Sequence, residues 1–281
     1  MPVTTAVRNR ATLPADQYLQ VEDARLRYRD EGDGPVIALL HGWTLDLEMW
    51  DPQVTALRDE FRLVRVDRRG HGLSSGVPAP ERDAADLAAL CRHLGITQLG
   101  LVGMSQGARG AVSLAGTAPS LVRALLLDGP PLLESAGAED DLRLDEFRAL
   151  VRAHGMAAFR REWRRHPLMQ LRTQDPQVHA QLAAMIERYP GRELTEPRAP
   201  RPALAAPVLP QSVLSPALVL SGEYDLPTRV QSAARLCAQL PRAQRTVIAG
   251  AGHLPNLDCP DEYSQICRAF FRRHLRAPCT P

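Results

Sequence analysis

The sequence predicts an α/β fold in which a mostly parallel sheet is covered by helices on both faces. Short apolar runs alternate with helical patterns along most of the 281 residues, and this alternation is typical of parallel sheets. One long stretch, residues 132–215, lacks any strand pattern and interrupts the alternation. A serine flanked by glycines, Ser105, lies where one predicted strand passes into a helix. Together these observations indicate a single sheet-based core with one helical insertion.

The predicted strands are of two kinds. Gln17–Val21 and Ala24–Arg29 alternate apolar and polar residues, which favours an antiparallel hairpin at a sheet edge. Val36–Leu40 is instead a continuous apolar run, as expected of a strand that is covered on both faces. The other later strands are Arg62–Val66, Gln98–Val102, Val122–Leu127, Ala217–Leu220 and Arg245–Ala249.

Helical spacing separates the strands and fills the insertion. In the alternating part the predicted helices are Met49–Glu60, Asp83–Leu94, Gln106–Ala118, Arg229–Leu240 and Pro260–Leu275. In the insertion they are Leu142–His154, Met156–Arg165 and Pro176–Arg188. Because open α/β sheets bind ligands at the carboxyl ends of their strands, we expect the insertion to cover those ends as a lid. We therefore predict a core domain of residues 1–131 and 216–281, with an eight-stranded sheet, and a lid of residues 132–215.

Composition limits the class of partner. The net charge is +2 and the apolar fraction 44%, so nothing favours nucleic acid or an anionic membrane. The five cysteines are scattered and never spaced as C-x-x-C, which predicts free thiols, a reducing compartment and no zinc site. No apolar leader or membrane span is evident. We expect a cytoplasmic protein with a small-molecule substrate, no cofactor and no metal; a homodimer is left open.

The stretch around Ser105 has the pattern of a nucleophile elbow. Gly103-Met104-Ser105-Gln106-Gly107 follows a buried strand and opens a helix, which is the context that gives G-x-S-x-G its meaning. In such an elbow the strand and helix pack so closely that a Cβ at either glycine would collide. The helix directs its free N–H groups and its positive dipole end at the serine. Ser105 is therefore the predicted nucleophile.

A serine nucleophile needs a base, and the base needs an acid. His253 follows the last predicted strand and is the candidate base, while Asp225 follows the strand Ala217–Leu220 and is the candidate acid. The chain order Ser105, Asp225, His253 is the order found in α/β-hydrolases. Asp128 also follows a strand and remains a rival for the role of the acid.

Two backbone N–H groups are predicted to form the oxyanion hole. One belongs to Gln106, directly after the nucleophile, and the other to Trp43, after His41-Gly42. Loss of one such donor costs roughly 3 kcal/mol of transition-state stabilisation. We interpret His41 as a structural hydrogen-bonding residue behind the loop, and His71 as a support for the turn after Val66.

The lid carries the candidate substrate-binding residues. On a helix Phe159 and Trp163 share one face, and Trp163 is the side chain we expect to touch substrate. Arg160 and Arg164 flank that face, and each guanidinium could hold a substrate carboxylate through two parallel hydrogen bonds. The alternative is that both arginines belong to a solvated surface.

These motifs resemble the α/β-hydrolase superfamily, in its serine-nucleophile branch with a small helical lid. The resemblance rests on His41-Gly42, Asp67-Arg68-Arg69-Gly70-His71-Gly72-Leu73-Ser74, Gly103–Gly107, Gly222-Glu223-Tyr224-Asp225 and Gly252-His253. Within that superfamily, Glu48–Val54 followed by Arg69-Gly70-His71-Gly72 is similar to 3-oxoadipate enol-lactone hydrolases. A serine nucleophile in place of aspartate argues against haloalkane dehalogenase and epoxide hydrolase chemistry.

The resulting expectation is a serine hydrolase that cleaves a small ester or lactone through an acyl-enzyme. The alternatives on the same scaffold are a carbon–carbon bond hydrolase acting on a diketone, and a perhydrolase, lyase or cofactor-free oxygenase.

Overall fold

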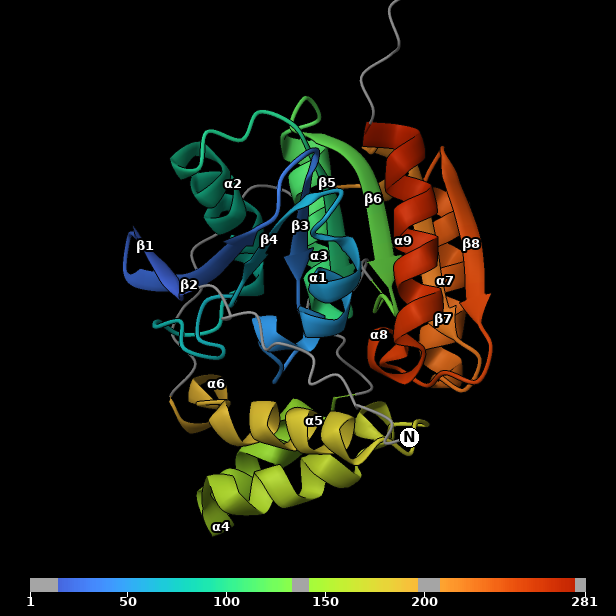
Figure 1. The fold of residues 1–281 in the computed structure, drawn as a ribbon. Coiled ribbons are helices and arrows are strands. Elements are labelled where there is room, and N and C mark those ends of the chain that lie inside the picture. The colour runs from blue at the N-terminus through green and yellow to red at the C-terminus, as the bar shows by residue number, and fades with distance from the viewer. Residues whose placement is uncertain (1–14, 133–141, 197–207, 276–281) are drawn as a thin grey trace, which may run out of the picture.

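Eight strands form one sheet in the computed structural model, which describes residues 15–132, 142–196 and 208–275. The strands are β1 (Gln17–Val21), β2 (Ala24–Glu31), β3 (Val36–Leu40), β4 (Arg62–Val66), β5 (Leu99–Met104), β6 (Val122–Asp128), β7 (Ala217–Gly222) and β8 (Ala243–Ile248). Their order across the sheet is β1-β2-β4-β3-β5-β6-β7-β8 (Figure 1). The pairs β1–β2 and β2–β4 are antiparallel and the others are parallel, so the predicted fold class is confirmed.

Helices cover both faces of the sheet because its side chains alternate between two apolar clusters. On one face lie α1 (Asp51–Leu57) and α9 (Pro260–Leu275), which pack with alternate residues such as Leu126 of β6. On the other face α2 (Asp83–His93), α3 (Gln106–Thr117) and α7 (Pro227–Gln239) pack with residues such as Leu127. The predicted helix Met49–Glu60 is in fact shorter, since its start is the 3₁₀ helix Leu47–Trp50.

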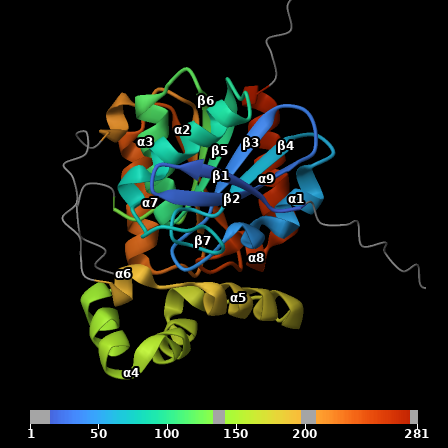
Figure 2. The same cartoon turned by 90° about the vertical axis from the view of Figure 1, so that its left-hand side faces the viewer.

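A second group of helices lies beyond the carboxyl ends of the parallel strands (Figures 1 and 2). It consists of α4 (Leu144–Arg165), α5 (Pro176–Arg188) and α6 (Arg192–Thr195). Gly155 breaks α4 with φ 75° and ψ 173°, which matches the two helices that the sequence predicts on either side of it. These three helices are called the lid below. No strand occurs in the described residues between β6 and β7.

The segment that connects the lid to β7 packs differently from the prediction. Val208 and Val213 join the apolar cluster of α3 and α7, and Val213 is fully buried. The described residues 208–216 therefore lie on the core, although the sequence places them in the lid. Their proline-rich composition lacks a periodic pattern, so sequence alone could not assign them. Parts of the predicted lid, 133–141 and 197–207, lie outside the described residues, as does Cys279.

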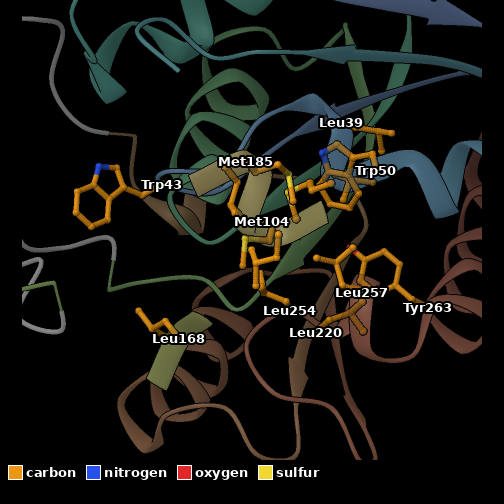
Figure 3. Close-up of a cluster of buried hydrophobic side chains, with 14 of the residues drawn as sticks. Leu39, Trp43, Trp50, Met104, Leu168, Met185, Leu220, Leu254, Leu257 and Tyr263 are labelled. Carbon is orange, nitrogen blue, oxygen red and sulfur yellow. The ribbon is translucent and has the colours of Figure 1, made fainter. Parts of the chain in front are cut away.

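The remaining short elements are α8 (Pro255–Asp258) and the 3₁₀ helices Pro80–Arg82, Pro167–Met169 and Pro210–Ser212. One apolar cluster runs from the sheet into the lid without a break (Figure 3). Met104 and Leu220 enter it from the sheet, Leu254 from the segment after β8, Met185 from α5 of the lid and Leu168 from the 3₁₀ helix between α4 and α5. Burial of such side chains stabilises by about 25 cal/mol per Å² of apolar surface, so the cluster favours a closed lid.

Candidate active site

The turn between β5 and α3 is strained at one residue. Ser105 has φ 50° and ψ −118°, in a region that non-glycine residues rarely adopt. A Cβ on Gly103 would lie 2.7 Å from the carbonyl oxygen of Gly107. A Cβ on Gly107 would lie 2.7 Å from the carbonyl oxygens of Leu40 and His41. These distances confirm the packing argument made from the sequence: strand and helix approach too closely for any side chain at either glycine.

Two neighbouring segments hold the serine in place. Its backbone N–H donates to the carbonyl oxygen of Asp128 at the end of β6, at 2.7 Å. On the other side the loop after β3 passes so close that a Cβ on Gly42 would lie 3.4 Å from the Ser105 Cβ. Ser105 is only 7% exposed, with these two segments packed around it. Strain of this kind persists only where the surroundings fix the backbone, and here they do.

His253 and Asp225 lie together, as their positions after β8 and β7 predict. The Nδ1 of His253 lies 2.9 Å from Oδ2 and 3.0 Å from Oδ1 of Asp225. Asp225 Oδ1 also accepts the backbone N–H of Leu226 at 2.7 Å, which fixes the carboxylate. Since Nδ1 donates to a carboxylate, Nε2 of the imidazole is the nitrogen that can accept a proton.

Asp128, the rival acid, lies in a different environment. Its side chain is fully buried, and the Tyr263 hydroxyl on α9 faces it. Burial raises the pKa of the Asp128 carboxyl well above its usual range, and the nearby charge of Asp225 raises it further. Both effects favour the protonated form of Asp128. Among the described contacts of His253, the hydrogen-bonded carboxylate is that of Asp225.

Gly129 joins these groups, and sequence reasoning did not single it out. A Cβ at this position would lie 2.9 Å from Cε1 of His253 and 3.3 Å from Oδ2 of Asp225. Its φ of 50° is also in the glycine-favoured region. Ser105 bonds to residue 128, and His253 and Asp225 lie next to residue 129, so all three predicted residues lie at the end of β6. In the sequence, the pair Asp128-Gly129 at the end of a predicted strand was the feature that could have indicated this position.

Of the two residues predicted to form the oxyanion hole, Gln106 is part of the elbow and Trp43 lies on the loop after β3 that passes beside it. His41 donates from Nδ1 to the carbonyl oxygen of Gly42 at 2.7 Å, and its Nε2 accepts the N–H of Arg68 at 2.8 Å. Burial lowers the pKa of His41 well below its usual value, so the ring is neutral and has a structural role, as predicted. The Gln106 side chain accepts from the Arg68 guanidinium at 2.9 Å. Arg68 thus supports both Gln106 and the loop that carries Trp43.

The turn after β4 is held by buried polar groups. Asp67 accepts the backbone N–H groups of Leu47 and Leu73, each at 2.8 Å. Burial and the neighbouring Asp46 raise the pKa of Asp67 to about 7. His71 contacts the carbonyl oxygen of Arg69 at 3.0 Å, and burial lowers the pKa of His71 to about 3. These contacts agree with the supporting role expected of His71.

Trp163 is buried, and its indole N–H donates to the hydroxyl of Thr44 at 2.7 Å. Its ring packs against that of Trp43, with 4.8 Å between centroids. The rings of Phe147 and Phe159 contact both tryptophans, and the ring of Tyr189 contacts Trp43. The lid thus meets the loop after β3 through aromatic side chains. Contact of Trp163 with substrate stays a prediction.

Arg160 and Arg164 have protein partners on the next lid helix. Arg160 donates to Glu187 at 3.2 Å and to the carbonyl oxygen of Tyr189 at 3.1 Å. Arg164 donates to the same Glu187 carboxylate at 3.0 Å. Glu187 is largely exposed, so these pairs lie at the lid surface. Substrate binding by the two arginines stays a prediction that these contacts do not support.

The described residues hold no group of three His, Cys, Asp or Glu side chains that could bind a metal ion. Nor is any helix in the described ranges long and apolar enough to cross a membrane. The four cysteines in those ranges are free thiols.

A strained elbow serine, a histidine–aspartate pair and an eight-stranded sheet of this order together match one group of proteins. The chain belongs to the α/β hydrolase fold family, whose model matches residues 35–260. That span contains the elbow, the pair and the lid.

Individual relatives resemble the chain to different extents. Over 133 residues it is 37% identical to 2-(acetamidomethylene)succinate hydrolase of Mesorhizobium japonicum, which is 46% of this chain and 45% of that protein. The match therefore spans less than half of that relative. A thermophilic esterase from Thermogutta terrifontis is 28% identical, with a TM-score of 0.77 over 92% of this chain and 100% of that one. The enol-lactonase from Burkholderia xenovorans LB400, 24% identical with a TM-score of 0.73 over 91% and 100%, shares the fold.

Proposed function

We propose that this protein is a serine hydrolase that cleaves small carboxylic esters or lactones through an acyl-enzyme. The observation that carries the proposal is the strained Ser105 at the end of β5, beside the hydrogen-bonded pair His253–Asp225. The likeness to a Thermogutta terrifontis esterase along almost the whole chain supports an ester as substrate. The burial of Ser105 supports a small one.

In the first half-reaction Ser105 Oγ attacks the carbonyl carbon while its proton passes to Nε2 of His253. The carbonyl π electrons move to oxygen, and the backbone N–H groups of Trp43 and Gln106 stabilise the resulting oxyanion. Asp225 stabilises the imidazolium. When the intermediate collapses, the bond to the leaving alcohol breaks and the alkoxide takes the proton from His253.

The second half-reaction repeats these steps with water. His253 removes a proton from water as its oxygen attacks the acyl carbon, and a second oxyanion forms in the same place. Collapse breaks the bond between the acyl carbon and Ser105 Oγ, which regains its proton from His253. The products are one carboxylic acid and one alcohol, which stay linked when the substrate is a lactone.

Labelling with a fluorophosphonate tests the proposal. We expect wild type to form one adduct at Ser105, and Ser105→Ala to lose both the adduct and hydrolysis of esters while its fold is retained. Ser113→Ala, on the same helix α3, is the matched control and should be labelled like wild type. An adduct that persists in Ser105→Ala would overturn the proposal. A panel of esters, lactones and diketones then defines the substrate, and preference for diketones would favour carbon–carbon hydrolysis.

A further inference from the structure

The loop after β3 is hydrogen-bonded to the lid in both directions. The indole N–H of Trp43 donates to Oε1 of Glu193 on α6 at 2.6 Å. The indole N–H of Trp163 on α4 donates to Oγ1 of Thr44 at 2.7 Å. Both tryptophans are buried, and a buried hydrogen bond is costly to lose because its partner is left without water.

The remaining lid helix, α5, contacts the same loop through ion pairs. Arg188 on α5 donates from Nε and Nη2 to Oδ2 of Asp46, at 3.0 and 2.7 Å. It also donates to Glu48 at 2.6 Å. Asp46 is buried, so the pair is shielded from solvent on the loop side. Each of the three lid helices therefore bonds to one residue of the four-residue stretch 43–46.

The backbone of this stretch is strained at one residue. Thr44 has φ 64°, a left-handed conformation that is strained for a β-branched residue. His41, two residues before the stretch, is fixed by the core through Arg68. The strained residue is instead bonded through its side chain to Trp163 of the lid. Strain of about 1–3 kcal/mol persists only if such contacts balance it.

We propose that the closed lid positions the oxyanion donor, with Trp163 as a positioning residue that acts on the Trp43 N–H through Thr44. The inference rests on the proposed function, because the N–H of Trp43 is the donor that it concerns. Ser105 is only 7% exposed and the lid lies beyond the carboxyl ends of the strands, so we expect substrate entry to require movement of the lid, which would break the bonds to residues 43, 44 and 46. The oxyanion hole is then complete only after the lid has closed over bound substrate, which limits catalysis to that state.

The test is Trp163→Phe, which keeps an aromatic ring and removes the N–H donor. Its matched control is Trp50→Phe, because the buried Trp50 N–H has no hydrogen-bond partner among the described residues. We expect kcat of Trp163→Phe to fall about tenfold or more, since small displacements in an active site have effects of this size. KM should stay within about twofold, and a trifluoromethyl ketone that forms a tetrahedral adduct should bind more weakly by the same factor as kcat falls.

A second variant excludes a folding artefact. Thr44→Val removes the acceptor of the same hydrogen bond, so its effect on kcat should match that of Trp163→Phe. The double variant should be little worse than either single one, because both remove one interaction. If Trp163→Phe and Thr44→Val show the kcat and ketone affinity of Trp50→Phe, the inference is wrong.

Hydrogen exchange separates this inference from the proposed function. In Trp163→Phe the amides of residues 41–46 should exchange faster than in wild type, whatever the reaction is. If wild type is not labelled at Ser105, the proposed function fails. Faster exchange of residues 41–46 in Trp163→Phe would then still show that the lid stabilises the loop. If Ser105 is labelled and exchange over 41–46 is unchanged, the inference alone fails.

Discussion

The elbow and the lid contact the active site through different parts of the chain, backbone in one case and side chains in the other. At the elbow, backbone packs on backbone: the missing side chains of Gly103 and Gly107 bring α3 against β3 and β5. At the lid, side chains make the contacts, through two indole N–H groups and one guanidinium. The first arrangement is rigid because it has no alternative packing. The second can separate and form again, as a cover over an active site must.

The two regions also differ in the range of their contacts along the chain. The elbow is a five-residue pattern between a strand and a helix, whereas the lid bonds join residues 119, 142 and 150 positions apart. Local geometry therefore determines the position of Ser105. We infer that the long-range bonds to the lid determine the position of the loop after β3. The following predictions test this division, from the largest expected effect to the smallest.

The largest effect is expected at the acid of the core site. Asp225→Asn should reduce kcat by about 10⁴-fold, because an amide cannot fix the imidazole tautomer or stabilise the imidazolium. Asp128→Asn should change kcat far less, since burial favours the neutral form of Asp128 and His253 is bonded to Asp225. Steady-state kinetics of both variants on one ester decides the matter. The reverse ranking would transfer the role to Asp128.

The elbow should tolerate no added side chain. Gly107→Ala would force a Cβ to within 2.7 Å of two backbone oxygens, so we expect the free energy of unfolding to drop by about 3 kcal/mol. Gly95→Ala is the control, because its Cβ meets no atom within 4 Å and only its left-handed φ of 67° opposes the change. That variant should lose about 1 kcal/mol and keep its activity. Urea unfolding measures both, and equal losses would refute the packing argument.

The buried Asp128 predicts a stability that depends on pH. Its folded pKa is raised, so the folded protein holds this proton to a higher pH than the unfolded chain, which releases it above about pH 4. Wild-type stability should therefore fall, relative to Asp128→Asn, by about 1.4 kcal/mol per pH unit between the unfolded and folded pKa values. Urea unfolding at pH 5 and pH 8 checks this. A constant difference between the two proteins would contradict the raised pKa.

The smallest effects are expected at the outer surface of the lid. Arg160→Ala and Arg164→Ala each remove a bond to the exposed Glu187, so stability should change by about 1 kcal/mol or less. Neither variant should alter the ratio of rates for an acidic lactone and its methyl ester. If either does, that arginine binds a substrate carboxylate, and the lid contributes charge as well as position.

The sequence was most informative where the geometry is local. Strand ends, the elbow and the positions of Asp225 and His253 could be predicted because each is a short pattern beside an apolar run. The break at Gly155 was likewise marked by the residue that makes it. The edge of the sheet at β1 could be predicted because β1 and β2 alternate apolar and polar residues.

The lid contacts could not be predicted in the same way. Nothing near Thr44 in the sequence indicates a left-handed backbone, and nothing near Glu193 indicates a tryptophan partner 150 positions away. Arg160 and Arg164 have the spacing of a helix face, but the carboxylate that they meet lies on another helix. Gly129 was hidden because its close approach to His253 exists only once three strand ends meet.

The most direct test of the account is whether an acyl group becomes attached to Ser105 during turnover. Wild type would be mixed rapidly with a p-nitrophenyl ester and quenched in acid, and its peptides analysed by mass spectrometry. The account predicts a burst of p-nitrophenol and an acyl group on the peptide that contains Ser105. Steady turnover with no burst and no adduct, or an adduct on another residue, would contradict it.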